Sequence, residues 1–554
     1  MSSDNEKSRP SRLSQRSLGV SNRVWLIILL FLAVLGITHY LSPSSQTQDF
    51  KPYSTVDLKS INYLNGTEKP PNPFEFCPSY GPMDRLGTKY GPSVLSQSRL
   101  HLGSGARIHR VLNRALNGHP VTISVLGSSI SACHGAGDDP ISPKCYPSKF
   151  FKWWNSVFPH PATELTNGAM RRTNSGYFGF CNAHHLPDVT DLVIIELDTE
   201  DSPDQDMMEN FEILIRSILI RPDQPAVLLL GHFSPQIHTQ YGFAGPDHHH
   251  NAVAQFYDVP HVSIKSAVYP EYIRDPNSVS KFFVDPVLSS PLGHDLITDI
   301  LVAYFQDQIC TVWGVATGQI YSADAAEAIG NPAGGGGIFG GVGQRKGVPE
   351  EHRDTGDGLD ANENRIKPEP KDSVNSNPLL QAQLRVPAGR INTRPNSGHP
   401  FEEIAPYCVS ANDLINPLPP SLFYGSGWHA FHPSTASGSG AENALKTTAH
   451  YWYSTLPTSK LRIPIQVGAG DIGVYYLREP VSVIGEGSAV ECWVDDNYAG
   501  ARVIENAANI GEPVAALEVI DHYVSRGSHF VECQLMGEEG QGVPPFKIVG
   551  VFST

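Results

Sequence analysis

Short apolar runs alternate with helix-like segments between residues 96 and 320. The runs are rich in β-branched residues and have the length of buried strands, whereas the longer segments carry apolar residues at helical spacing. The predicted strands are 121–126, 191–197, 226–231 and 261–264, and the predicted amphipathic helices are 207–220 and 293–308. This alternation predicts an α/β domain of three layers, in which helices cover both faces of a parallel sheet.

The C-terminal region, residues 405–554, has a strand-like pattern throughout. Alternating or β-branched runs are separated by Gly, Pro and Asn turns, which predicts an all-β domain of sandwich or jelly-roll type. The predicted strands are 461–467, 489–494, 516–523, 529–535 and 546–552. Residues 321–404 contain a four-glycine run and a charged, Pro-rich tract. Their apolar content is too low for a core, so they predict a disordered linker.

An uncharged apolar run near the N-terminus predicts a membrane anchor. Residues 24–41 approach the ~20 residues that span a bilayer, with Trp25 and Tyr40 where interfacial aromatic residues are common. Basic residues outnumber acidic ones in residues 1–23, which predicts a cytoplasmic tail before a transmembrane anchor at 24–41. A cleaved signal peptide is the alternative, but no small-x-small cleavage site follows the run.

This topology assigns the rest of the chain to the lumen or the cell exterior. We expect a single-pass type II membrane protein of the secretory pathway, in the Golgi or at the cell surface, with lumenal C-terminal domains. Residues 42–95 are Pro-rich and predict a stalk. Within it, Asn65 begins an Asn-Gly-Thr glycosylation acceptor.

Length, charge and cysteine content narrow the class of protein. The 554 residues allow two to three domains, and the net charge of −16 makes nucleic acid a poor partner. Eight cysteines are compatible with disulfides in an oxidising compartment, and no paired CxxC zinc pattern occurs. The candidate pairs are Cys133 with Cys145 and Cys492 with Cys533; eight buried free thiols are the alternative.

The most informative stretch is 121–137, VTISVLGSSISACHGAG. Its first half is β-branched and apolar, which predicts a buried strand, and its second half changes to Gly, Ser, Cys and His, which is typical of a tight turn. In open α/β sheets, ligands bind outside the carboxyl ends of the strands. Ser128, Ser129 and Ser131 are therefore candidate nucleophiles, unless the turn only caps a helix.

The run LGSSISA at 126–132 resembles the first sequence block of the SGNH (GDSL-type) hydrolases. The wider chain is similar to fungal membrane-anchored proteins with an SGNH-hydrolase-type esterase domain, some of them capsule-associated. The resemblance covers residues 121–308 and implies an SGNH-like three-layer domain at 96–320. It also implies that Ser129 is the nucleophile.

The block that carries the family's catalytic histidine is altered. It resembles residues 285–294, where Asp285 and His294 are kept and Leu288 stands at the histidine position. Leucine cannot accept a proton, so the resemblance leaves His294, with His232 as the alternative, to act as base for Ser129. Asp285 would orient the imidazole.

The two oxyanion blocks are altered as well. Glu200, between Asp198 and Asp201, stands where the family has an asparagine donor, and a carboxylate there would oppose a developing oxyanion. Arg172 stands at the usual glycine of the second block. The resemblance therefore implies an oxyanion site built from the amides of Ser129 and Arg172, with contributions from the rest of that block, Asn167 and Gly168.

Other clusters add few candidates. Trp428 and Trp452 predict a sugar-stacking platform, although core packing is the commoner role of tryptophan. Adjacent histidines at 248–250 are more typical of a solvated loop than of a metal site. No phosphate-binding glycine motif occurs. We therefore expect no metal and no cofactor.

Together these features predict a membrane-anchored serine esterase or acyltransferase that acts on acyl esters of a carbohydrate. The alternative is a catalytically impaired protein of the same fold that binds glycans or assists polysaccharide assembly. Leu288 and Glu200 favour that alternative.

Overall fold

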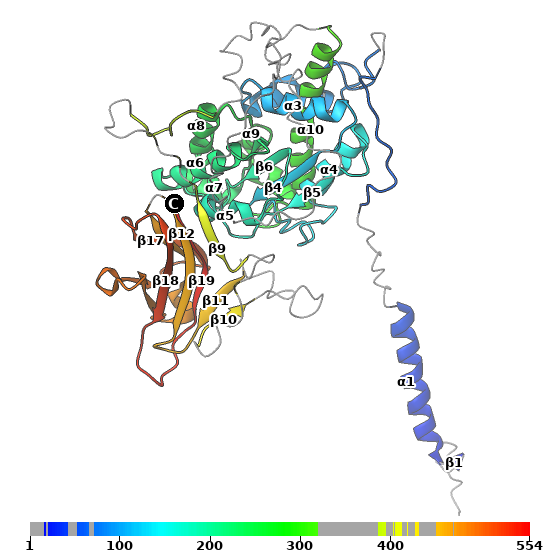
Figure 1. The fold of residues 1–554 in the computed structure, drawn as a ribbon. Coiled ribbons are helices and arrows are strands. Elements are labelled where there is room, and N and C mark those ends of the chain that lie inside the picture. Colours follow the sequence, from blue (N-terminus) through cyan, green and yellow to red (C-terminus); the bar gives the residue numbers. More distant parts are fainter. Residues whose placement is uncertain are drawn as a thin grey trace, which may run out of the picture. The chain divides into compact units, whose positions relative to one another are not determined.

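The computed structural model describes residues 16–17, 20–41, 53–65, 71–319, 386–394, 401, 403, 405–412, 418, 427–431, 450–468 and 470–554. The chain divides into two compact units, Met1–Ser54 and Thr55–Thr554. In the first unit, strands β1 (Arg16–Ser17) and β2 (Val20–Ser21) pair antiparallel before helix α1 (Asn22–Leu41) (Figure 1). Within the described residues, no helix has both the length and the apolar character needed to cross a membrane. The anchor predicted at 24–41 thus coincides with a helix but is not confirmed as a membrane span.

The second unit begins with the predicted α/β domain. Its sheet has the strand order β3-β8-β7-β6-β4-β5, and all neighbours are parallel except β3, which pairs antiparallel with β8. The strands are β3 (Arg99–His101), β4 (Thr122–Gly127), β5 (Glu164–Asn167), β6 (Leu192–Glu196), β7 (Ala226–Gly231) and β8 (His261–Ser263). The four predicted strands are confirmed, and the fold class is the predicted one.

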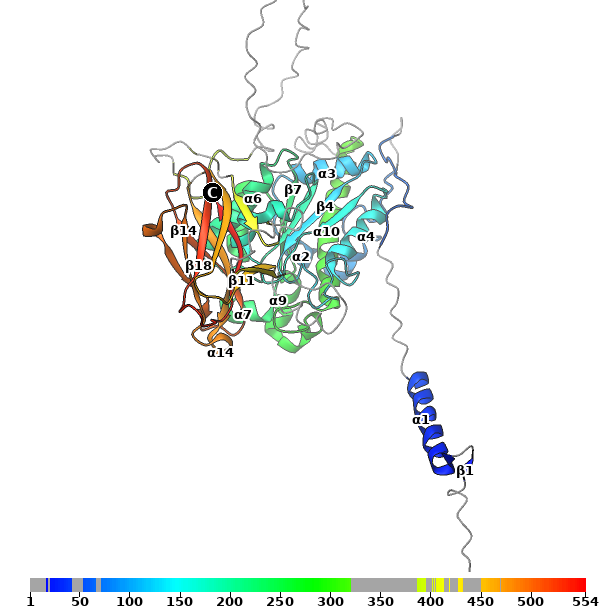
Figure 2. The same ribbon diagram turned by 60° about the horizontal axis from the view of Figure 1, so that its bottom comes forward.

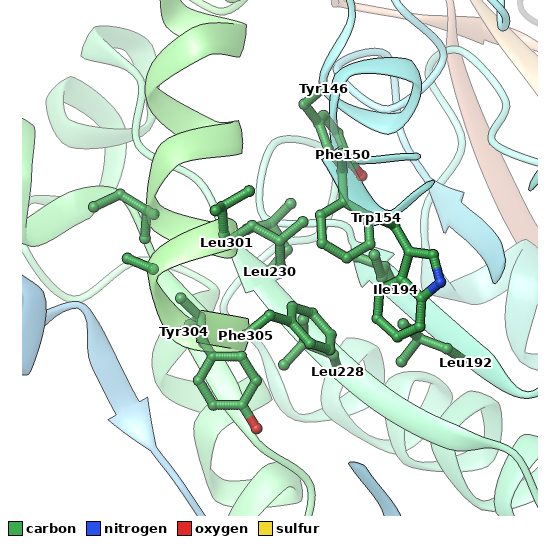
Figure 3. Packing of buried hydrophobic residues seen from close by; sticks show 14 of the residues in the cluster. Tyr146, Phe150, Trp154, Leu192, Ile194, Leu228, Leu230, Leu301, Tyr304 and Phe305 are labelled. Atoms are coloured by element: carbon green, nitrogen blue, oxygen red, sulfur yellow. The ribbon is translucent and has the colours of Figure 1, made fainter. Parts of the chain in front are cut away.

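Helices cover both faces of this sheet because side chains alternate along each buried strand. In β6, Leu192 and Ile194 enter one core, whereas Val193 and Ile195 enter the other. The first core is closed by α3 (Ala106–Leu116), α4 (Tyr146–Val157) and α10 (Pro291–Ala316), and Figure 3 shows part of it. The second is closed by α5 (Ser175–Cys181), α6 (Gln205–Leu219) and α8 (Asp247–Tyr257). The remaining helices are α2 (Arg85–Gln97), η2 (Asn182–His184), α7 (Pro235–Tyr241), α9 (Lys265–Arg274) and η3 (Pro276–Phe282).

The C-terminal domain is a sandwich of two sheets. One sheet has the order β12-β18-β14-β15; the other has β10-β11-β19-β13-β16, with β17 added to β13 and β9 to β19. Strand β12 alternates strictly between exposed and buried residues, as its sequence KLRIPIQV predicts. The elements are β9 (Tyr407–Ser410), β10 (His429–Phe431), β11 (Tyr451–Ser454), β12 (Lys460–Val467), β13 (Ile472–Pro480), α14 (Val481–Ile484), β14 (Ala489–Val494), η6 (Tyr498–Gly500), β15 (Arg502–Glu505), β16 (Ala507–Ala508), β17 (Val514–Asp521), β18 (Gly527–Leu535) and β19 (Phe546–Ser553).

The two domains share an apolar interface, and Figure 2 shows their elements from a second side. Tyr475 and Leu477 of β13 belong to the same buried cluster as the α5 and α6 side chains. The Tyr475 hydroxyl donates to Asn174 Oδ1 at 2.9 Å. A disulfide between Cys181 and Cys408 crosses the same interface. The β-sandwich is therefore docked on the α/β domain through covalent, polar and apolar contacts.

Parts of the predicted stalk and of the predicted linker pack against the α/β domain. In the predicted stalk, Phe74 and Leu95 are buried in the first core, and the Phe74 ring meets Trp313 edge-on. The stalk prediction is therefore wrong for residues 71–95. Low overall apolar content does not prevent single aromatic residues from docking.

Residues 386–394 of the predicted linker contact α6, where Arg216 donates to two of their carbonyl groups. Residues 320–385 lie outside the described residues.

All eight cysteines form disulfides: Cys77–Cys310, Cys133–Cys145, Cys181–Cys408 and Cys492–Cys533. Both predicted pairs are confirmed, and the alternative of eight free thiols is wrong. Asn65 is exposed, while the rest of its glycosylation motif lies outside the described residues.

Candidate active site

The turn after β4 separates the three candidate serines. Ser128 Oγ contacts Glu196 and Thr199, and Ser131 Oγ contacts Glu196 and the Tyr146 hydroxyl. These two serines are buried structural partners of Glu196. Ser129 is the one of the three that lines a cavity.

The tightness of this turn depends on Gly127. A Cβ at Gly127 would lie 2.6 Å from the Glu196 carbonyl oxygen, which is too close for any side chain. Glycine therefore lets the strand end against β6 and places Ser129 at the carboxyl edge of the sheet.

The cavity has a volume of about 820 Å³ and takes walls from both domains. The loops after β4 and β6 supply one side, and the segment before α10 supplies another. Residues 510–514 of the β-sandwich complete it. The lining residues are Ser129, His134, Arg171, Arg172, Thr199, Glu200, Gln236, Asp285, Pro286, Val287, Leu288, Ile510, Gly511, Glu512, Pro513 and Val514.

The Ser129 hydroxyl is held by two direct hydrogen bonds. It donates to Glu200 Oε1 at 2.9 Å and accepts from the backbone N–H of Arg172 at 2.9 Å. Arg172 has a φ of 51°, a left-handed conformation that is uncommon for a residue with a side chain. Its guanidinium contacts Glu512 of the β-sandwich. Arg172 thus links the nucleophile candidate to the second domain.

Glu200 is a half-buried residue whose carboxyl group lines the cavity. Burial raises its pKa to about 7, although the Ser129 hydrogen bond and the charge of Arg172 pull the pKa down. Glu200 therefore changes its protonation state near neutral pH. A carboxylate with such a pKa is suited to accept a proton.

Asp198 and Asp201, the carboxylates on either side of Glu200, both bond a histidine instead of lining the cavity. His250 Nδ1 bonds Asp198 at 2.7 Å, and His250 Nε2 bonds Asp201 at 2.8 Å. Burial by itself lowers the pKa of His250, but these two carboxylates outweigh it and raise the pKa to about 10. The three residues form a buried ion triad away from the lining of the cavity.

His294 and Asp285 do not join Ser129. The buried His294 ring stacks on Tyr146, and its Nδ1 accepts the Tyr146 backbone N–H at 3.2 Å. Burial lowers the pKa of His294 to about 3. Asp285 accepts the backbone N–H groups of Val287 and Leu288 and so closes its own turn. Within the described residues, no hydrogen bond forms the Asp285–His294–Ser129 relay that the sequence analysis predicts.

The alternative base, His232, follows β7 and is also buried. Its backbone N–H donates to Asp198 at 2.9 Å, and its ring meets Phe283 edge-on. Burial lowers the pKa of His232 to about 4, so the ring is a weak base. Nor does this ring line the cavity described above.

The residues predicted as oxyanion donors do not all reach Ser129. Asn167 Nδ2 donates to the carbonyl groups of Ser131 and Pro140, and the Gly168 N–H donates to Val125. Both residues thus hold the local backbone. Of the second-block residues predicted as donors, Arg172 is the one whose amide reaches Ser129.

His134 is a cavity residue that the sequence analysis did not consider. Its Nδ1 bonds Asp138 Oδ1 at 2.5 Å, and its Nε2 accepts from Arg171 Nη2 at 2.8 Å. Burial and the Arg171 charge lower the pKa of His134. Because Arg171 occupies its accepting nitrogen, His134 orients the guanidinium. The available signal was its place five residues after Ser129 in the same turn.

The predicted sugar platform is not formed. Trp428 and Trp452 are buried in the core of the β-sandwich, and Trp428 Nε1 donates to the Ser459 carbonyl. Burial of their rings leaves no face for a sugar. In the part of the chain that the structure describes, no cluster of His, Cys, Asp and Glu could hold a metal ion.

Comparison with known proteins supports the fold. No family model and no curated protein matches the chain. Among solved structures, the chain is similar to a two-domain esterase (CEX) active on acetylated mannans, with a TM-score of 0.53 and 18% identity over 83% of this chain and 98% of that one. A second structure of CEX, co-crystallised with mannopentaose, gives a TM-score of 0.51 over the same shares. The likeness extends over both domains, which agrees with the two-domain fold described above.

Proposed function

We propose that the protein is a serine-dependent ester hydrolase or O-acyltransferase that acts on O-acylated glycans. One observation carries this proposal: the Ser129 hydroxyl lies in a cavity between an N–H donor from Arg172 and the Glu200 carboxyl group. A hydroxyl placed between a donor and a proton acceptor is arranged for nucleophilic attack.

The reaction follows from this geometry. Ser129 Oγ attacks the acyl carbonyl carbon and gives up its proton, which forms a tetrahedral intermediate. The Arg172 N–H donates to Ser129 Oγ and so holds the attacking oxygen in position. Collapse releases the sugar hydroxyl and leaves an acyl-serine, which water hydrolyses or a second sugar hydroxyl accepts. The likeness to an esterase active on acetylated mannans supports a carbohydrate as the alcohol component.

The test combines one substitution with covalent labelling. Ser129→Ala should abolish turnover of p-nitrophenyl acetate and of an acetylated oligosaccharide, while Ser202→Ala, in the loop after β6 but outside the cavity, should retain it. A fluorophosphonate should label the wild-type protein at Ser129. A wild-type rate that survives Ser129→Ala would refute the hydrolase and transferase readings together.

A second candidate function is supported by Leu288. It occupies the position of the family's histidine and lines the cavity, so the protein would be a glycan-binding or polysaccharide-assembly factor without turnover. In that case wild type and Ser129→Ala would bind an acylated oligosaccharide equally and hydrolyse none of it. Calorimetric binding measured beside an activity assay separates the two functions.

We also propose that the protein works in the secretory pathway or outside the cell. Four disulfides support this, because such bonds persist in oxidising compartments. Treatment with an N-glycosidase should shift the mass of the native protein but not of Asn65→Gln. An unmodified Asn65 in protein recovered from a cytosolic fraction would contradict the proposal.

A further inference from the structure

We propose that Glu200, rather than a histidine, is the general base that accepts the proton of Ser129. This inference rests on the proposed function and names the residue that makes the serine reactive. Ser129 and Glu200 are in direct contact, with 2.9 Å between Oγ and Oε1, which is within the reach that proton transfer requires.

The second hydrogen bond of Ser129 fixes the direction of its proton. The Arg172 N–H donates to Oγ and occupies one of its lone pairs, so the hydroxyl hydrogen is directed at Glu200. A lone pair of Oγ remains for attack on a carbonyl carbon. The same amide stays in place as the serine oxygen changes from hydroxyl to ester.

Among the described residues, no hydrogen bond joins a histidine ring to the Ser129 hydroxyl, although His294 Nε2 and both ring nitrogens of His232 have no hydrogen-bond partner there. His294 Nδ1 accepts from the Tyr146 amide, and His134 Nε2 accepts from Arg171. His232 is buried and is not among the residues that line the cavity. Glu200 is therefore the proton acceptor that the structure puts in contact with the nucleophile.

Charge balance removes the objection that a carboxylate opposes an oxyanion. As the Oγ–C bond forms, the Oγ–H bond breaks and the proton moves to Glu200 Oε1, so Glu200 becomes neutral while the carbonyl oxygen becomes negative. The net charge of the site is unchanged. Two guanidinium groups, those of Arg171 and Arg172, act on the same site and favour the negative charge in either place.

The remaining steps return the proton. When the tetrahedral intermediate collapses, the protonated Glu200 gives its proton to the departing sugar oxygen, and the acyl-serine is left. Water or a sugar hydroxyl then attacks as Glu200 takes its proton. In the final collapse the Oγ–C bond breaks and Glu200 gives its proton to Ser129 Oγ, which releases the acid or the new ester and restores the Ser129 hydroxyl.

The charged groups around Glu200 set its working range. Burial is the largest contribution and raises its pKa; the Ser129 hydrogen bond and the charges of Arg172 and Arg171 lower the pKa, and Asp201 raises it. Glu200 in turn raises the pKa of the neighbouring Glu196. The resulting pKa of about 7 predicts that kcat/KM rises with pH through neutrality as Glu200 ionises.

The test compares Glu200→Gln with wild type. Glutamine keeps the size and an accepting oxygen but cannot take the proton, so kcat/KM should fall by ~10²–10⁴-fold and its rise through neutral pH should disappear. Glu200→Asp keeps the carboxylate and should retain more activity than Glu200→Gln. Matched controls are His294→Gln and His232→Gln, each of which should keep the wild-type pH profile per folded molecule.

The outcomes separate this inference from the proposed function. If Ser129→Ala is inactive and Glu200→Gln keeps the wild-type rate, Glu200 is not the base but the function stands. If Ser129→Ala retains activity, both fail. If Glu200→Gln does not fold, a wild-type kcat/KM that is flat from pH 6 to 8 overturns the inference. Without turnover, the rate of fluorophosphonate labelling of Ser129 is the readout, and Glu200→Gln must slow it.

Discussion

Two carboxylate sites on the same loop after β6 have opposite surroundings. Asp198 and Asp201 both contact His250, whereas Glu200, one residue before Asp201, contacts the neutral Ser129 hydroxyl. The ion triad is sealed inside the domain, but Glu200 lines the cavity. Carboxylates that look equivalent along the chain therefore differ in chemistry because of the partner that each meets.

The protonation states differ accordingly. Hydrogen bonds from His250 outweigh the burial of Asp198 and lower its pKa, whereas no cation directly contacts Glu200 among the bonds described, and burial raises its pKa to about 7. His250 is thus protonated and Asp198 ionised at neutral pH, while Glu200 changes its protonation state there. A stable charge suits structure, and a variable one suits proton transfer.

The largest effect should come from breaking the ion triad. His250→Ala leaves Asp198 and Asp201 as buried charges without their cation, which should lower the free energy of unfolding by about 3–5 kcal/mol. Denaturant unfolding measures this. The control, His248→Ala, alters an exposed residue of the same helix and should change stability by less than about 0.5 kcal/mol. Equal effects would mean that the triad does not stabilise the fold.

The same triad should give the stability a defined pH range. The pKa of His250 is raised, so its contribution is complete below about pH 6.5 and is lost as the pH rises toward 10. The pKa of Asp198 is lowered, so its contribution is lost as the pH falls below about 4. Stability from this site should be highest between those values, with an alkaline slope of up to about 1.4 kcal/mol per pH unit. Unfolding curves across pH test this, and His250→Gln should lose the alkaline slope.

A smaller effect on stability is expected at His294, which accepts a backbone hydrogen bond instead of bonding carboxylates. His294→Leu removes the acceptor of the buried Tyr146 N–H and should cost about 1–3 kcal/mol. Turnover per folded molecule should stay within about twofold of wild type. A stable but inactive variant would move His294 into the catalytic machinery and weaken the contrast with Glu200.

The smallest effect on stability is expected from an exposed ion pair, the one between Arg172 and Glu512. The Arg172–Glu512 pair joins the two domains, but the Glu512 side chain is 70% exposed. Glu512→Gln should therefore lower stability by no more than about 1 kcal/mol, and less at high salt. Thermal unfolding at two salt concentrations measures this. If Glu512→Gln lowered stability as much as His250→Ala does, burial would not explain the difference between the exposed ion pair and the buried triad.

The sequence predicts well those features that depend on local pattern. The buried strand before Ser129 and its Gly-Ser turn are adjacent in the chain, and both are found as expected. The partner of Asp198 and Asp201 could not be found this way, because His250 lies 52 and 49 residues from them. Its position in a run of three histidines pointed to a solvated loop, whereas helix α8 turns His250 inward.

The contact between Glu200 and Ser129 could not be predicted from the sequence for a different reason. Alignment with a motif compares residue types at one position, and by that measure a carboxylate at an oxyanion position only opposes catalysis. Its distance to Ser129 is a property of the folded turn. Likewise, the residue type of Trp428 is compatible with a ring on the surface or in the core. Its burial depends on the strands that pack around it in the β-sandwich.

The wall that residues 510–514 add to the cavity has a consequence for biosynthesis. A ribosome makes Ser129 and Glu200 more than three hundred residues before that segment, so both residues are synthesised well before the last wall of their cavity. Closure must await the last part of the chain and its docking, which the Cys181–Cys408 bond then makes permanent. A prematurely terminated chain would contain Ser129 and Glu200 but not this wall of the cavity.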